Sequence, residues 1–219
     1  MKIYVSPSNQ TTNPYSYGGT NEEVQCNRIA DALVPHLVRN GYEVKRAARG
    51  NSIATNVKES NAWGAALHLA IHTNAGGGQG TEAYYWTTSA AGKKYAQAIY
   101  NRVAAISIGA DRGLKSGNHL YEIKNTRGAA VLVECEYHDN ANLAKWIVEN
   151  VAAIGEAIAR GICEADGKAF IEEPKAETTQ DSGTLYRVQC GAFKSKENAE
   201  KLVAKLKAAG FDAIIKEEK

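Results

Sequence analysis

Polar residues that could do hydrolytic chemistry follow directly on apolar runs of this chain. His72 ends the run LHLAIH, Glu134 ends AAVLVE, and Asn9 and Gln10 lie just beyond KIYV. A carboxylate after Val-Leu-Val is costly to bury unless it has a partner. If the runs are parallel strands, their carboxyl ends meet at one edge of a sheet. A histidine and carboxylates converging there would suit a zinc hydrolase, because zinc binds both groups and lowers the pKa of a bound water to about 7.

The segments that would position these residues alternate along the chain between the strand pattern, with a period of about 2 residues, and the helix pattern, with a period of about 3.6 residues. Strands are expected at 2–5, 43–47, 67–72, 81–86, 119–123 and 129–134, and helices at 23–40, 53–62, 89–106 and 142–163. Pro35 is expected to kink or locally break the first helix. The alternation predicts an α/β fold, with a mostly parallel sheet covered by helices on both faces.

Several segments taken together resemble one family, the zinc-dependent N-acetylmuramoyl-L-alanine amidases of amidase type 3. They are Glu23-Val-Gln-Cys-Asn27, LHLAIHTNA (67–75), DRGLK (111–115) and LYEIKNTRGAAVLVE (120–134). The resemblance covers roughly residues 1–165 and implies a phosphorylase/hydrolase-like sheet with Zn²⁺ as cofactor. It implies peptidoglycan as substrate, cut between N-acetylmuramic acid and the L-alanine of the stem peptide. It further implies Glu23 and His72 as metal ligands and Glu134 as the catalytic glutamate.

One position departs from that family's pattern. The first strand of the family ends in P-G-H-G-G, whose histidine binds zinc, whereas Asn9 stands there in this chain. The chain resembles a subgroup that opens with S-P-S-x-Q, and the third ligand stays open among Asn9, Gln10 and His138. An amidase-fold protein that binds the wall with weak or no catalysis is therefore an alternative, and another zinc hydrolase such as a carboxypeptidase is a third.

The same residues also have purely structural interpretations. Glu23 could close a capping box at the start of its helix. His72 could be a core histidine, and Glu134 could be the buried partner of Arg112 or Arg127.

Composition divides the chain into an expected amidase domain (1–170), a linker (171–183) and a tail (184–219). The linker has one lysine against four carboxylates, and the tail has eight basic against five acidic residues. The tail predicts a small β-α-β module, with strands at 184–193 and 212–216 around a helix at 194–211. Through YRVQCGAF and ENAEKL it resembles half of a SPOR domain, which implies binding to glycan strands stripped of stem peptides and a possible homodimer.

Charge and hydropathy exclude other classes. The 219 residues carry 26 Lys and Arg against 24 Asp and Glu, a net charge of +2, which gives no case for nucleic-acid binding. We expect no membrane span, because no apolar run approaches about 20 residues. The first ten residues lack the features of a signal peptide. We therefore expect synthesis in the cytoplasm and action at the cell wall or extracellularly after release, as for an endolysin.

Overall fold

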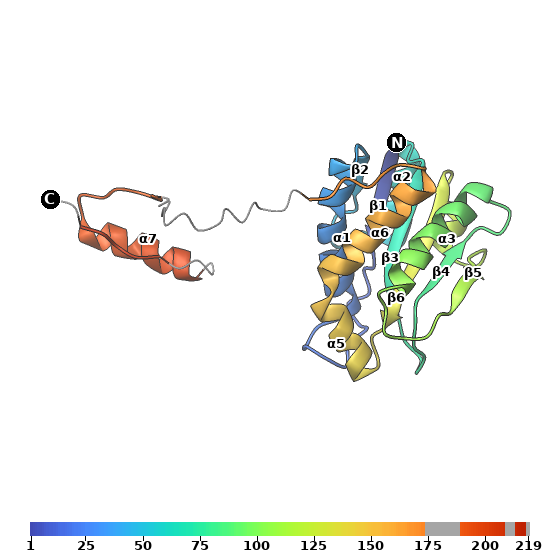
Figure 1. Cartoon of the computed structure of the whole chain (residues 1–219), viewed down its shortest axis with the longest axis horizontal. Helices are drawn as coiled ribbons and strands as arrows, with labels where there is room; N and C mark the ends of the chain where they lie inside the picture. Colours follow the sequence, from blue (N-terminus) through green and yellow to red (C-terminus); the bar gives the residue numbers. More distant parts are fainter. Residues whose placement is uncertain (174–188, 209–212, 218–219) are drawn as a thin grey trace. The chain divides into compact units, whose positions relative to one another are not determined.

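The computed structural model describes residues 1–173, 189–208 and 213–217. The chain divides into two compact units, Met1–Glu173 and Pro174–Lys219, and each is described by itself. Figure 1 shows the first unit as a sheet wrapped by helices, and in the described part of the second unit it shows the helix α7.

Six strands of the first unit form one mixed sheet in the order β2-β1-β3-β6-β4-β5. Their bounds are β1 Lys2–Pro7, β2 Glu43–Arg46, β3 Leu67–Asn74, β4 Glu82–Tyr85, β5 Gly113–Ser116 and β6 Ala129–Tyr137. Neighbouring strands are parallel except β4 and β6, which are antiparallel. The prediction of a mostly parallel sheet is confirmed, and the carboxyl ends of β1, β3 and β6 lie at one edge.

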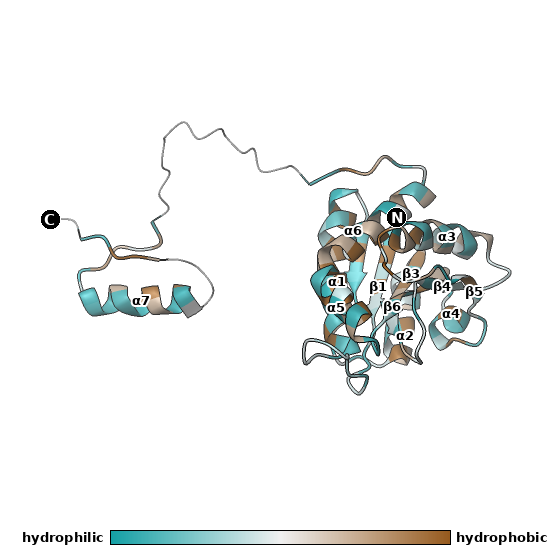
Figure 2. Cartoon of the chain, turned by 60° about the horizontal axis from the view of Figure 1, so that its bottom comes forward, coloured by the Kyte–Doolittle hydropathy of each residue, from teal (hydrophilic) through white to brown (hydrophobic). Residues whose placement is uncertain are grey.

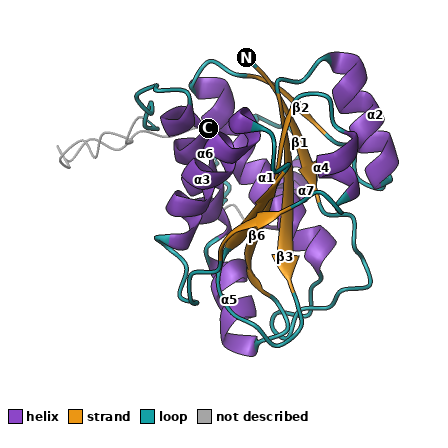
Figure 3. Ribbon diagram, turned by 90° about the vertical axis from the view of Figure 1, so that its right-hand side faces the viewer, coloured by secondary structure: helices purple, strands orange, loops and turns teal. Residues whose placement is uncertain are grey.

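Helices cover both faces of this sheet (Figure 3). Their bounds are α1 Glu22–Arg39, α2 Ile53–Trp63, α3 Ala90–Ala104, α4 Tyr121–Asn125, α5 Ala141–Glu149 and α6 Val151–Ala165. Helices α1, α3 and α6 lie on one side and share the main hydrophobic core with the strands, while α2 and α4 lie on the other. Among the described residues no helix is long and apolar enough to cross a membrane.

The alternation of β3 explains which residues reach each face. Leu67, Leu69 and Ile71 are fully buried in the main core beneath α1 and α6. Successive side chains of a strand point to opposite faces, so His68 and His72 point toward α2 and α4. The strand thus buries its apolar half on one side and places two histidines on the other.

Two predictions for the first unit are wrong. The segment 119–123 is not a strand but leads into the short helix α4, in which the consecutive residues Glu122 and Ile123 are both buried. The predicted helix 142–163 is two helices, because Asn150 has non-helical angles (φ −115°, ψ 19°) and its side chain donates to the Trp146 carbonyl oxygen. Strand β5 was not predicted at all.

Pro35 does not end α1, which runs unbroken through it. Proline removes one backbone hydrogen bond from a helix. Leu33 and Leu37, on either side of it, are fully buried in the core. Tertiary packing of this apolar stripe therefore holds the helix together across the proline.

The predicted linker begins in contact with the first unit. The Ile171 amide donates to the Asn40 side chain at 2.7 Å, and Glu172 pairs with Arg160 at 2.7 Å. Residues 171–173 are thus tied to the first unit, and the rest of the predicted linker (174–183) lies outside the described residues.

In the second unit, α7 spans Lys196–Ala208, within the predicted helix 194–211. The described parts of the two predicted tail strands, 189–193 and 213–216, are not in a strand, and the remainder of both lies outside the described residues. Figure 2 shows α7 as a largely hydrophilic helix with one hydrophobic stretch. So small a unit buries little: Ile214 is 86% exposed.

Candidate functional site

A row of polar residues crosses the sheet at the carboxyl end of β3. His72 of β3 is in register with Glu134 of β6, and Glu134 is in register with Glu82 of β4. Arg112 neutralises Glu82 through a contact of 2.9 Å. At the outer end of this row, Glu82 is therefore paired with Arg112. The inner part of the row consists of His72 and Glu134.

The start of α1 brings a carboxylate onto His72. Asn21 caps the helix by accepting from the Val24 amide, and the next residue, Glu22, is 1% exposed. The Glu22 Oε1 atom lies 2.9 Å from His72 Nδ1. The helix start therefore delivers a buried carboxylate to the end of β3.

Glu23, which the sequence predicted at this place, lies elsewhere. Its Oε1 accepts from the side chain of Asn27 at 3.1 Å, one turn further along α1. Neighbouring helix positions differ by about 100° in direction. The helix can therefore turn only one of the two glutamates toward β3, and that residue is Glu22. The capping box is not formed either, because Asn21 supplies the cap.

Of the three candidates for a third ligand, the structure brings one to His72. The Gln10 amide lies 3.4 Å from His72 Nδ1 and 3.3 Å from Glu22 Oε1. Asn9 instead donates to the backbone of Asn51. His138 is buried, stacked on Tyr15, with its Nδ1 bonded to Thr73 rather than placed at His72.

Asn13 is a part of this cluster that sequence reasoning missed. Its side-chain amide donates to Glu22 Oε2 at 2.8 Å and to Gln10 Oε1 at 2.9 Å. It lies in a loop between β1 and α1, where no periodicity marks it. Asn13 fixes the relative positions of Glu22 and Gln10.

Glu134 has one carboxylate oxygen that no hydrogen-bond donor of the described residues reaches. Its Oε2 atom is buried without a partner. Burial raises the pKa of Glu134 to about 7, with repulsion from Glu22 and Glu82 adding to the rise and His72 opposing it. The alternative of an ion pair with Arg112 fails, because that arginine binds Glu82. A buried carboxyl group with a pKa near 7 suits the exchange of protons at neutral pH.

A second buried carboxylate, also missed, lies on the other side of His72. Glu122 Oε2 is 3.7 Å from His72 Nε2, and Glu122 Oε1 is 3.0 Å from His68 Nε2. Burial would raise the pKa of Glu122, but hydrogen bonds from both histidines outweigh it and hold that pKa at about 2. Sequence reasoning assigned this residue to a strand and so did not see it.

Both carboxylates act on His72. Burial lowers the pKa of its imidazole, but hydrogen bonds to Glu122 and Glu22 and attraction to Glu134 raise it to about 10. Within the described residues, the ion pairs of Glu22 and Glu122 are made with histidines alone. The two buried carboxylates, together with the partly buried Glu134, thus have a deficit of positive charge.

This donor set can be tested against the chemistry of a metal ion. Over the described part of the chain, no three His, Cys, Asp or Glu side chains group so as to hold one ion. Yet imidazole, carboxylate and amide meet at Nδ1 of His72, and Glu134 leaves a bare oxygen beside them. The imidazole and the carboxylate are two strong ligand types for a divalent cation. Gln10 would add a weaker ligand only with its side chain turned over, because its amide nitrogen faces His72 and its oxygen faces Asn13.

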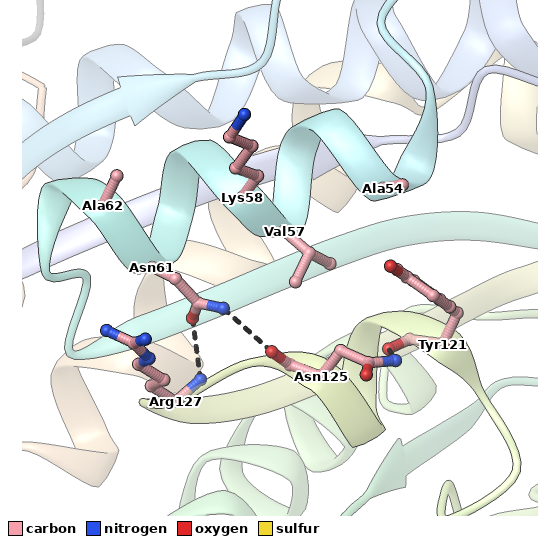
Figure 4. Close-up of a pocket in the computed structure, with 8 residues that line it drawn as sticks. All are labelled: Ala54, Val57, Lys58, Asn61, Ala62, Tyr121, Asn125 and Arg127. Carbon is pink, nitrogen blue, oxygen red and sulfur yellow. Dashed lines mark hydrogen bonds between the residues drawn. The ribbon is translucent and has the colours of Figure 1, made fainter.

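A groove lies away from this cluster, between α2 and α4 (Figure 4). It has a volume of about 430 Å³. The Asn61 side chain crosses it, donating to the Asn125 carbonyl oxygen and accepting from the Arg127 amide. This groove contains none of the cluster described above.

Solved structures share the fold of the first unit. The catalytic domain of CwlV, an N-acetylmuramoyl-L-alanine amidase from Bacillus (Paenibacillus) polymyxa var. colistinus, aligns with a TM-score of 0.68 and 24% identity over 77% of this chain and 100% of that one. AmiC2, an N-acetylmuramoyl-L-alanine amidase of Nostoc punctiforme, aligns with a TM-score of 0.70 and 20% identity over 77% and 98%. The first unit has the fold of amidase catalytic domains.

Sequence comparison makes the assignment specific. The chain belongs to the Amidase_3 family, N-acetylmuramoyl-L-alanine amidase, whose model matches residues 3–164, and a SPOR domain model matches residues 172–219. The sporulation-specific N-acetylmuramoyl-L-alanine amidase of Bacillus subtilis (strain 168) is 31% identical over 223 residues, and the amidase CwlM of Bacillus licheniformis is 28% identical over 222. Each alignment covers 98% of this chain and 84% of the relative.

Proposed function

We propose that this chain is a peptidoglycan hydrolase that cuts the amide between N-acetylmuramic acid and the L-alanine of the stem peptide. The observation that carries the proposal is the contact of 2.9 Å between Glu22 and His72, beside the unpartnered Glu134, in a domain of the Amidase_3 family. The family assignment supplies the bond, and the cluster supplies the groups that hydrolysis needs.

We further propose that His72 and Glu22 hold a Zn²⁺ ion, with the amide oxygen of Gln10 as third ligand. Glu22 takes the part that sequence reasoning gave to Glu23. A flip of the Gln10 side chain would bring its oxygen to face His72, and it would break the hydrogen bond that the Asn13 amide donates to that oxygen. When bound, zinc polarises the scissile carbonyl and lowers the pKa of water.

In this mechanism Glu134 moves the protons. As a carboxylate it takes one proton from the attacking water while the water oxygen bonds to the lactyl carbonyl carbon. It then gives that proton to the nitrogen of L-alanine as the carbon–nitrogen bond breaks. The products are a free lactyl carboxyl group and a free amino group, and Glu134 is restored.

The second unit is proposed to bring the enzyme to its substrate. The SPOR match supports binding to glycan strands stripped of stem peptides, the product that an amidase leaves. Action at the cell wall or extracellularly follows from both modules. Exposed apolar residues of this unit, Phe193 at 48% and Ile214 at 86%, support a homodimer formed through it. Light scattering that finds only monomer over a wide range of concentrations would exclude the dimer.

The test of the activity uses the purified chain with purified cell walls. We expect release of free amino groups, with mass spectrometry locating the cut before L-alanine. Glu134→Gln should lower the rate by about 10²–10⁴ while the zinc content stays at that of the parent. Binding to walls without any release of amino groups would favour the alternative of an inactive wall-binding protein. Products cut elsewhere in the stem peptide would favour a carboxypeptidase-like hydrolase.

A further inference from the structure

Glu122 faces His72 from the side opposite to the proposed metal ligands. Nδ1 of the His72 ring meets Glu22 and Gln10, whereas Nε2 points to Glu122 Oε2 at 3.7 Å. One nitrogen of the ring is thus engaged by the candidate ligands and the other by a different carboxylate. A histidine that binds a metal through one ring nitrogen commonly donates its other N–H to a carboxylate.

We propose that Glu122 is a positioning residue that holds the His72 ring with Nδ1 directed at the metal position shared with Glu22 and Gln10. This inference rests on the proposed function, because it gives Glu122 a role through the metal. Glu122 does not bind the ion, since the ring of His72 lies between the two.

The carboxylate of Glu122 is itself held by side chains of two strands, one of which is fixed in turn by α2. Ser6 of β1 donates to Oε1 at 2.5 Å, and Asn56 of α2 donates to the Ser6 hydroxyl at 3.0 Å. His68 of β3 contacts the same Oε1 at 3.0 Å. Oε1 is therefore used up by neighbours behind the site, and Oε2 is left to face His72.

Burial makes this arrangement rigid. Glu122 is 3% exposed, and Ser6 and His68 are 2% and 0% exposed. His68 is further fixed by stacking on Tyr4, with ring centroids 5.4 Å apart. A carboxylate anchored in this way can fix the orientation of a ring, which an exposed glutamate with free rotamers cannot.

A simpler role would be charge balance for His68 alone. In that case loss of the Glu122 charge would change folding stability and leave metal affinity unaltered. The positioning role predicts instead that metal affinity falls, because a carboxylate that holds a metal-binding histidine typically contributes about 10- to 100-fold to affinity. Metal affinity and folding stability therefore separate the two roles.

The experiment measures the zinc dissociation constant of the full chain by competition with a chromophoric chelator, together with the absorption spectrum of the Co²⁺-loaded protein and the melting temperature of the metal-free protein. The variant is Glu122→Gln, which keeps the shape and removes the charge. The matched control is Glu59→Gln, a carboxylate on the same side of the sheet that accepts from Tyr4 and faces Lys45. We expect zinc affinity to fall about 10- to 100-fold in Glu122→Gln, with an altered Co²⁺ spectrum, and to stay within twofold of the parent in Glu59→Gln.

Parent-like zinc affinity and Co²⁺ spectrum in a folded Glu122→Gln protein would overturn this inference and leave the proposed function intact. A parent chain that binds no zinc would refute the metal step of the proposed function and this inference with it. If Glu122→Gln does not fold, the variant Ser6→Ala tests the positioning role instead, because it removes one of the donors that fix Oε1 of Glu122. We expect a loss of affinity of about two- to tenfold in that variant, and an unchanged affinity would count against the proposal.

Discussion

Replacing Glu22 or Glu23 by glutamine tests which of these adjacent residues binds the metal. The family pattern predicts Glu23 as the ligand, whereas the structure brings Glu22 to His72. In Glu22→Gln the side chain keeps one acceptor oxygen, whereas the parent uses Oε1 for His72 and Oε2 for Asn13. With a proton on His72 Nδ1, one buried hydrogen bond is lost whichever way the amide turns, at a cost of about 1–3 kcal/mol. That is a fraction of the roughly 5–15 kcal/mol of a typical domain, so the variant should fold.

The effect on catalysis should be much larger than the effect on folding. Even a residue that only supports a metal ligand contributes about 10- to 100-fold, so loss of one of the two proposed strong ligands should lower activity by at least about 100-fold. Glu23→Gln is the matched control: its amide oxygen can still accept from Asn27, and its stability should stay within about 0.5 kcal/mol of the parent.

The assay follows the release of amino groups from purified walls with an amine-reactive dye, and zinc content is measured on the same samples. Melting temperatures show that each variant is folded; we expect a fall of about 2–12 °C for Glu22→Gln. An inactive Glu23→Gln beside a fully active Glu22→Gln would refute the reasoning from the structure and restore the assignment made from the family pattern. Full activity in both variants would remove both glutamates from the metal site.

Three further outcomes are expected. Dialysis against a chelator should abolish activity, and added zinc should restore it. The zinc concentration that restores activity should be higher for Gln10→Ala than for the parent, and equal to that of the parent for Asn9→Ala. Equal zinc requirements in the two variants would remove Gln10 from the ligand set. A chain ending after residue 173 should keep its melting transition but bind whole walls less than the full chain in a pull-down assay, and equal binding would argue against a targeting role for the SPOR unit. Gly161→Ala should lower the melting temperature by about 2–12 °C, because the added Cβ would lie 2.6 Å from the Ile99 Cα across the α3–α6 contact. An unchanged melting temperature would show that these helices can move apart at little cost in stability.

Local patterns sufficed for the strands at the centre of the sheet and for the long amphipathic helices. The run 67–72 was recognisable because the residues on its core face are apolar, while two of the three on the other face are histidines. His72 and Glu134 could be singled out because each is a polar residue that ends an apolar run. The same logic failed at 119–123, where alternation is mimicked by a five-residue helix. It also failed at Asn150, where one side chain bonded to the backbone divides a continuous apolar stripe.

The amino-acid sequence by itself determined the fold class, the family and the strand ends at which polar residues gather, because these depend on periodicity and on residue order. Only the tertiary structure showed that Glu22, and not Glu23, contacts His72, since this depends on the direction in which α1 leaves its cap at Asn21. It likewise brought Glu122 to His72 from 50 residues further along the chain, through the packing of α4 against the sheet. Contacts of this kind leave no local pattern, because burial and distance are properties of the folded chain alone.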